Sequence, residues 1–174
     1  MKKIIPAPIF CLVIFLIQGC SAPKKATAVV VPTTIEKERV IHKSFESTWQ
    51  STIELLATYN MPIKNLDKSS GFISTEYKLI TGNPTQYMVA SGASSNFMGK
   101  VDLTNYGGNL NVLLKKITED STRVCVNVFY TCTANKYKYA SLLSSNYVLE
   151  SSTQIDCATT GNLEKAILDY LANR

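Results

Sequence analysis

The sequence predicts an α+β domain: an antiparallel sheet of about four to five strands, with an N-terminal and a C-terminal helix packed on one face. Two observations carry this prediction. Apolar residues recur at helical spacing early in the chain and again at its end, and the segments between them alternate apolar and polar residues and are joined by turn signals. The length of 174 residues leaves room for one such domain.

A short strand over Glu38–His42 precedes the first helix. Ser44 is a good N-cap residue, and apolar residues follow it every three or four positions, as on one face of a helix. Asn60 and Pro62 end this helix. The apolar positions are Phe45, Trp49, Ile53, Leu56 and Tyr59.

The sheet is predicted from the segments that follow. Strands are expected over Pro62–Asp67 and Phe72–Ile80, with a turn at Lys68–Gly71 between them. Two further strands, around Leu110–Leu114 and Val124–Tyr130, alternate apolar and polar residues and are joined by a hairpin loop at Glu119–Thr122. The final helix is indicated by Leu163, Ala166, Ile167, Tyr170 and Leu171.

Two intervals, 81–108 and 133–160, fit no regular element. Both are longer than most loops of a compact domain, which indicates functional loops, disorder or elements without a clear pattern. If the four strands after the first helix form a meander, both intervals leave the sheet at the same end, and their side chains meet there.

The N-terminus has the pattern of an export signal. Lys2 and Lys3 precede an apolar stretch of fourteen residues, Ile4–Ile17, which is shorter than the roughly 20 residues that a bilayer core requires. Leu16-Ile17-Gln18-Gly19-Cys20 resembles the lipobox of bacterial lipoproteins. This resemblance implies that residues 1–19 are removed and that Cys20 carries the lipid. It also implies, from Ser21, an outer-membrane location facing the periplasm.

Residues 20–34 hold the lipidated Cys20 and a flexible tether rich in Pro and small residues, and residues 35–174 form the single α+β domain. In the domain, Trp49, the Leu55-Leu56 pair, Pro62-Ile63 and the Leu66-to-Thr75 segment, with Asp67 and Gly71 at a turn, resemble the repeated domain of the BamC (NlpB) lipoproteins, accessory members of the outer-membrane β-barrel assembly machinery. The resemblance covers about thirty residues. It implies a helix-grip-like fold and carries no catalytic residue.

Three cysteines follow Cys20: Cys125, Cys132 and Cys157. They contain no C-x-x-C pair, which argues against a metal or thioredoxin-like site. Cys132 closes the last strand and Cys157 precedes the final helix, so in an oxidising compartment we expect a disulfide between them. Cys125 has the opposite parity from Cys132 and is expected to be a lone thiol. Three unpaired thiols are the alternative.

The sequence offers little for catalysis. His42 is the only histidine, at a strand end, and neither a G-x-S-x-G elbow nor a paired carboxylate accompanies it. We therefore expect no catalytic residue, metal or cofactor, and no enzyme activity. The net charge of +5 is not gathered on one segment, so a nucleic-acid partner is not expected.

Aromatic residues in the two unassigned intervals are the candidate contact residues, because Tyr and Phe are favoured at interfaces. They are Tyr87, Phe97, Tyr137, Tyr139 and Tyr147. The alternative is that they are core residues of further strands.

The sequence therefore favours a lipid-anchored envelope module for binding or assembly. Its acylated Cys20 would contact the membrane, and its protein partner would belong to an outer-membrane complex. The alternative is an enzyme or inhibitor directed at cell-wall material. A polar pocket holding a sugar or peptide near the loops would favour the alternative, and a flat apolar patch would favour the module.

Overall fold

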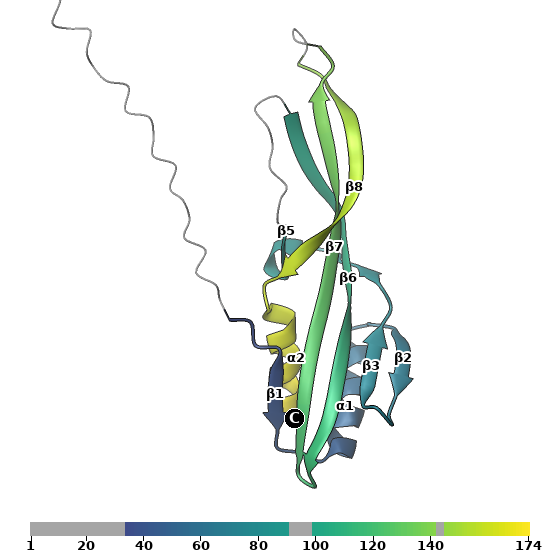
Figure 1. The fold of residues 1–174 in the computed structure, drawn as a ribbon, viewed down its shortest axis with the longest axis vertical. Helices are drawn as coiled ribbons and strands as arrows, with labels where there is room; N and C mark the ends of the chain where they lie inside the picture. Colours follow the sequence, from purple (N-terminus) through teal and green to yellow (C-terminus); the bar gives the residue numbers. More distant parts are fainter. Residues whose placement is uncertain (1–33, 91–98, 142–144) are drawn as a thin grey trace, which may run out of the picture. The chain divides into compact units, whose positions relative to one another are not determined.

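The chain folds around one antiparallel sheet that carries two helices, as a computed structural model shows (Figure 1). The structure describes residues 34–90, 99–141 and 145–174. In chain order the elements are β1 (Glu38–Ile41), α1 (Phe45–Thr58), β2 (Ile63–Asp67), β3 (Phe72–Thr75), β4 (Lys78–Leu79), the 3-10 helix η2 (Pro84–Gln86), β5 (Met88–Ala90), β6 (Gly99–Thr118), β7 (Ser121–Tyr139), β8 (Tyr147–Thr159) and α2 (Asn162–Asn173).

The strands follow the order β2-β3-β6-β7-β8-β5, with β1 paired to β7 and β4 paired to β6. The long hairpin of β6 and β7 forms the centre of the sheet, with strands of 20 and 19 residues. The meander expected for the four strands after the first helix is therefore present as β2-β3-β6-β7. The strand expected over 72–80 is split, because the chain leaves the sheet after Thr75 and pairs with β6 again at Lys78.

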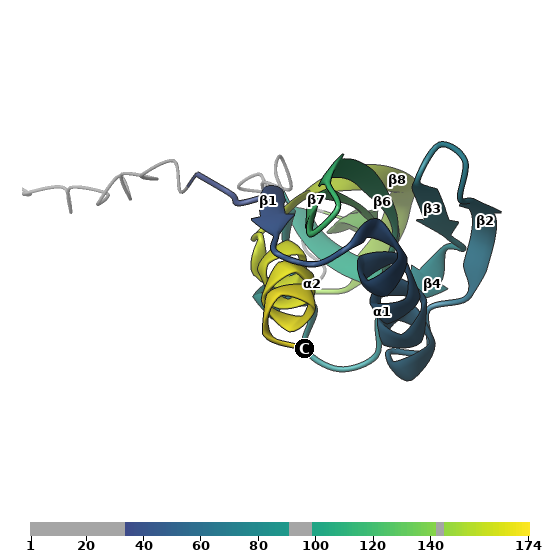
Figure 2. The same cartoon turned by 90° about the horizontal axis from the view of Figure 1, so that it is seen from below.

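Both helices lie on the same face of the sheet, against β6 and β7 (Figure 2). The side chain of Ser44 caps α1 by accepting a hydrogen bond from the backbone N–H of Ser47 at 3.3 Å. Alternate residues of the hairpin point toward the helices, which gives the core its period of two. Its buried members include Trp49, Leu55 and Leu56 from α1, Leu110, Val112 and Leu114 from β6, Val124, Val126 and Val128 from β7, and Ile167, Leu168 and Leu171 from α2.

The turn between β2 and β3 is fixed by Asp67 and Gly71, as the sequence predicts. One carboxylate oxygen of Asp67 accepts hydrogen bonds from the backbone N–H of Ser69 at 3.0 Å and from its hydroxyl at 2.6 Å. Gly71 has a φ of +72°, and a Cβ there would collide with the carbonyl oxygen of Leu114. Only glycine suits this close approach of two strands.

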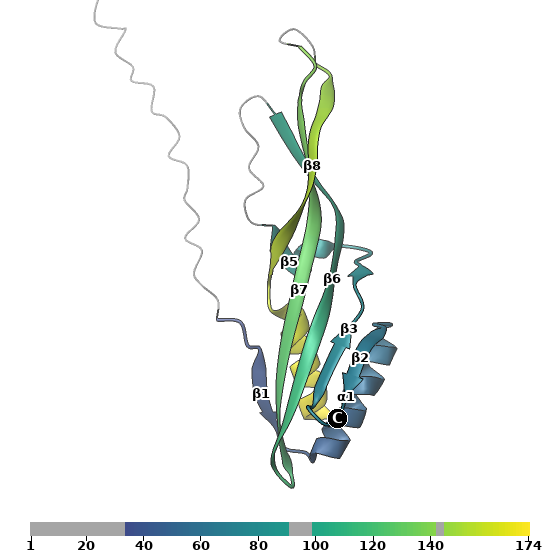
Figure 3. The same cartoon turned by 45° about the vertical axis from the view of Figure 1, so that its right-hand side comes forward.

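A bulge divides the central hairpin into two halves. Its register shifts between Thr104 and Gly107, and Asn105 in the gap has a φ of +51°. Beyond this point β6, β7 and β8 continue as a three-stranded ribbon past the two helices (Figures 1 and 3). We call residues 99–104, 133–139 and 147–154 the distal ribbon.

The predicted fold class, a helix-grip-like α+β domain with four to five strands, is wrong. The sheet has eight strands in the described part of the chain, and strands hold 54% of those residues against 22% for helices, so the fold is mostly β. Of the three strands that were not predicted, β5 and β8 lie in the intervals 81–108 and 133–160, and β4 results from the split of the strand expected over 72–80. Because no helix of the described residues covers the distal ribbon, its residues need not alternate between apolar and polar, and the sequence signal for a half-buried strand is absent there.

Candidate functional site

Tyrosines gather on one face of the distal ribbon. Tyr137 lies opposite Leu149 and Tyr139 lies opposite Tyr147 in the β7–β8 register, so all four side chains share a face. We call these four residues the tyrosine patch. The rings of Tyr139 and Tyr147 stack with centroids 4.7 Å apart, and the Tyr147 hydroxyl donates to the Tyr139 hydroxyl at 3.0 Å.

Three side chains of the tyrosine patch are open to solvent, and the fourth, Tyr137, is half-buried. Tyr139, Tyr147 and Leu149 are 39%, 44% and 55% exposed. The hydrogen bond to Tyr139 raises the pKa of Tyr147 above its usual value, so the hydroxyl stays protonated at neutral pH. Lys100 lies opposite Tyr137 on β6 and places a cation beside the rings. Tyrosine rings are among the side chains that protein interfaces favour.

The other two predicted contact residues are not part of this patch. Tyr87 follows η2, close to the start of α2, and is half-buried among core residues. Phe97 lies outside the described residues. The two intervals do meet, because β6 pairs with the distal half of β7 and β5 pairs with β8. Tyr87 lies at the β5 end, where its carbonyl accepts from the backbone N–H of Thr160, and so it does not share a surface with the tyrosine patch.

The sulfurs of Cys132 and Cys157 lie 2.8 Å apart. These residues are diagonal neighbours on β7 and β8, because Cys132 is opposite Ile155 and Cys157 is opposite Tyr130. The two thiols are free in this structure and buried, with exposures of 1% and 8%. Burial, and then the hydrogen bond with Cys132, raises the pKa of Cys157 to about 12. Cys125 is a separate, half-buried free thiol.

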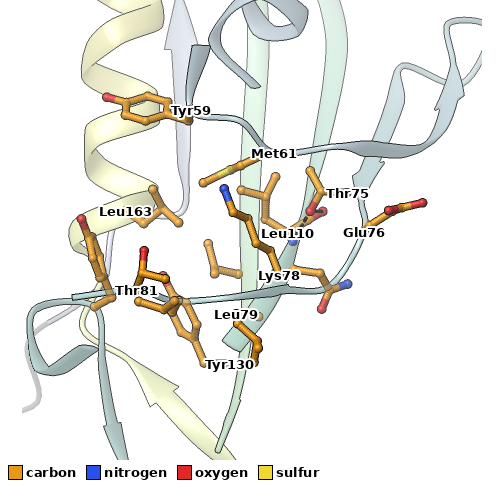
Figure 4. Close-up of a pocket in the computed structure, with 15 residues that line it drawn as sticks. Tyr59, Met61, Thr75, Glu76, Lys78, Leu79, Thr81, Leu110, Tyr130 and Leu163 are labelled. Atoms are coloured by element: carbon orange, nitrogen blue, oxygen red, sulfur yellow. Dashed lines mark hydrogen bonds between the residues drawn. The ribbon is translucent and has the colours of Figure 1, made fainter. Parts of the chain in front are cut away.

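A pocket of about 260 Å³ opens between the end of α1, the short strand β4 and the start of α2 (Figure 4). Leu110, Val128 and Tyr130 form its buried floor. Gly108 allows the ring of Tyr130 to lie against β6, because a Cβ there would collide with that ring. Tyr59 and Leu79, each about half exposed, stand at the rim. The sequence analysis did not identify this pocket, because its residues come from six separate segments of the chain.

A buried polar pair lies beside the pocket floor. The hydroxyl of Tyr130 and the Oε1 of Glu164 are buried without a hydrogen-bond partner among the described residues. The Oε2 of Glu164 accepts from the hydroxyl of Thr159 at 3.0 Å. Burial, and then the negative charge of Glu164, raises the pKa of Tyr130 well above its usual value. Tyr130 is therefore a neutral hydroxyl throughout the physiological range.

The described residues form no cluster of the side chains that usually bind metal ions. His42 is exposed at the end of β1. Within residues 34–90, 99–141 and 145–174, no three His, Cys, Asp or Glu side chains lie where they could hold a metal ion. In the same ranges, none of the helices has the length and apolar character that crossing a membrane requires. Cys20 and the predicted export signal lie outside the described residues.

No family model matches the chain, and no curated protein matches it.

Proposed function

We propose that this chain is a lipid-anchored module of the bacterial envelope that binds a protein partner, as an accessory subunit of an outer-membrane complex. The observation that carries the proposal is the tyrosine patch, a cluster of three tyrosines and a leucine that lies outside the core and is mostly exposed. Monomeric proteins leave such a cluster uncovered mainly where another molecule contacts it.

The geometry of the patch suits protein recognition. Tyr139 and Tyr147 already stack on each other, so little side-chain entropy is lost when a partner covers them. The hydroxyl pair leaves polar atoms at the surface for hydrogen bonds with a partner backbone. Lys100 contributes charge, although its ion pair with Asp102 at 2.8 Å partly neutralises it.

Export and anchoring supply the rest of the proposal. The lipobox-like end of the signal segment would place the acylated Cys20 in the outer membrane, with the domain facing the periplasm. A tether over residues 20–34 would then give the domain lateral freedom to reach a membrane-embedded complex. The resemblance of the segment from Trp49 to Thr75 to the BamC domain makes the barrel assembly machinery the first complex to examine.

The test is a surface variant that leaves the ribbon intact. Tyr139→Thr with Tyr147→Thr removes both rings and keeps β propensity. Phe129→Thr is the matched control, since Phe129 lies on the same strand and is 51% exposed outside the patch. Full-length protein with a C-terminal tag would be purified from its own cells in mild detergent, with or without the substitutions. We expect an envelope protein to copurify with the parent chain and the Phe129 variant and to be lost from the double variant.

Two results would contradict the proposal. One is a folded double variant that retains every partner of the parent chain. The other is loss of the partner from the Phe129 variant alone, which would place the interface around Phe129 and not on the tyrosine patch.

A further inference from the structure

The pocket has the polarity of a site for an amphipathic molecule. Its floor is apolar, with Leu110 and Val128 only 2% and 9% exposed, and Leu163 of α2 adds an apolar wall. The charged lining residues stand toward the mouth, where Lys78 and Thr81 are exposed. Two polar groups lie deeper: the hydroxyl of Thr75, which accepts from the backbone N–H of Leu110 at 3.0 Å, and the hydroxyl of Tyr130. A ligand that places an apolar tail on the floor and a polar head at the mouth matches this gradient.

Lys78 determines the charge of that head. Its ammonium group donates to the backbone carbonyl of Asn60 at 2.7 Å, and no carboxylate of the described residues forms an ion pair with it. Its side chain extends over the pocket toward Met61 (Figure 4). The mouth therefore holds a cation whose hydrogen-bonding capacity is only partly used, which favours an anionic head group.

The two nearby carboxylates fix the orientation of such a ligand. Glu76 is at the mouth, but Figure 4 shows its carboxylate directed away from Lys78 and Leu110. Glu164 follows Leu163 in α2, is fully buried, and places its negative charge near the floor residue Tyr130. It forms no ion pair among residues 34–90, 99–141 and 145–174. Its charge opposes an anion that enters head first, so the tail must lie inside and the head at Lys78.

The size of the pocket limits the length of the tail. A 150 Å³ apolar cavity binds benzene, which has six heavy atoms. At the same packing, a pocket of about 260 Å³ holds roughly ten heavy atoms. Octanoate, with eight carbons including the carboxylate carbon and two oxygens, has ten heavy atoms. The pocket is too small to enclose a two-chain lipid.

From these four observations we propose that the pocket binds a free, single-chain aliphatic carboxylate, with its chain on the Leu110–Val128 floor and its carboxylate paired with Lys78. This site is independent of the tyrosine patch, so either proposal can fail without the other.

The test compares three head groups on one chain length. Octanoate, octylamine and 1-octanol would each be titrated into the full domain at neutral pH, below their aggregation concentrations, with methyl resonances of the pocket leucines and Met61 as the readout. We expect octanoate to shift the methyl signals of Leu79, Leu110 and Leu163 and to bind about tenfold more tightly than 1-octanol. Octylamine should bind more weakly than either, because Lys78 repels it.

Variants of exposed lysines separate charge from folding. Lys78→Gln should weaken octanoate binding about tenfold, leave 1-octanol binding unchanged and remove the preference between them. Lys78→Arg should restore most of the affinity. The matched control is Lys64→Gln on β2, which is exposed and lies outside the pocket.

Four results would overturn the proposal. The first is that octanoate shifts no methyl signal, and the second is that the shifts are confined to the distal ribbon. The third is that octylamine binds more tightly than octanoate. The fourth is that Lys78→Gln and Lys64→Gln weaken octanoate binding equally. A fifth is a response to vesicles of anionic phospholipid without any response to octanoate, which would assign the surface to a bilayer instead.

Discussion

A disulfide between Cys132 and Cys157 is the prediction that can be worked out furthest. Their sulfurs already lie 2.8 Å apart on neighbouring strands, close to the approximately 2.05 Å of a bond. Oxidation by an exported dithiol–disulfide oxidoreductase would join the two sulfurs, while two protons and two electrons pass to the oxidant and reduce its own disulfide to two thiols. The bond would tie β8 to β7 just before α2 begins.

The size of the effect follows from the loop that the bond closes. The two cysteines are 25 positions apart, and loop-closure entropy for that length corresponds to about 3.5 kcal/mol at 25 °C. For a chain of this size, the midpoint of thermal unfolding should rise by roughly 7–14 °C. The alkylation order gives a second readout. In the reduced protein Cys125 should react first, because burial raises the pKa of Cys157 to about 12 and leaves almost no thiolate at neutral pH.

The assay compares thermal unfolding of the oxidised protein with and without reductant, and with Cys125→Ser as the matched control. Reductant should lower the midpoint of the parent chain and of Cys125→Ser alike. It should have no effect on Cys132→Ser. The refuting test uses protein taken from the periplasm and unfolded before any reductant is added. If both Cys132 and Cys157 are then alkylated, they were not joined by a disulfide and the reasoning is wrong.

Three further predictions concern the anchor, the floor of the pocket and the β2–β3 turn. Cys20→Ser should abolish palmitate labelling of the chain, and labelling that survives would end the lipoprotein assignment. Tyr130→Phe should change the free energy of unfolding by less than about 1 kcal/mol, or raise it, because the Tyr130 hydroxyl has no hydrogen-bond partner among the described residues. A loss above about 2 kcal/mol in urea unfolding would mean that this hydroxyl donates to Glu164. Hydrogen bonds from Ser69, and then from Ser70, lower the pKa of Asp67 from 3.8 to about 2. The ionised Asp67 carboxylate therefore stabilises the folded chain fully above about pH 4, and this stabilisation is lost as the pH falls toward 2. Asp67→Asn should therefore show a smaller loss of stability over that interval in acid titrations, and an unchanged slope would contradict this account.

The sequence allowed prediction of the parts of the fold that face a core. The stripe containing Trp49 and Leu56 became α1, and the alternating residues around Val112 and Val126 became the buried side of the central hairpin. The turn at Asp67–Gly71 was also foreseeable, because a turn that requires positive φ leaves glycine as a visible mark.

The distal ribbon could not be predicted in the same way. Both of its faces contact solvent, so residues such as Ser151, Ser152 and Thr153 form a strand without any hydrophobic pattern. Backbone pairing with β7 determines this conformation, and pairing partners distant in the sequence leave no local signal. The pocket escaped prediction for a related reason, since Lys78 and Leu163 approach each other only after the sheet and α2 have formed.

The candidate contact residues divide along the same line. Tyr137, Tyr139 and Tyr147 were chosen by residue type, and the β7–β8 register then places them on one face. Tyr87 was chosen by the same criterion but packs near the core, because η2 and β5 return the chain toward α2. Residue type alone does not distinguish an exposed aromatic from a half-buried one.

Site-specific photocrosslinking tests the central claim most directly. Benzoylphenylalanine would replace Tyr147 in one version of the full-length protein and Phe129 in another, and each would be irradiated in its own cells. The account predicts an adduct with one envelope protein from position 147 and no such adduct from position 129. No adduct from position 147, or the same adduct from both positions, would contradict it.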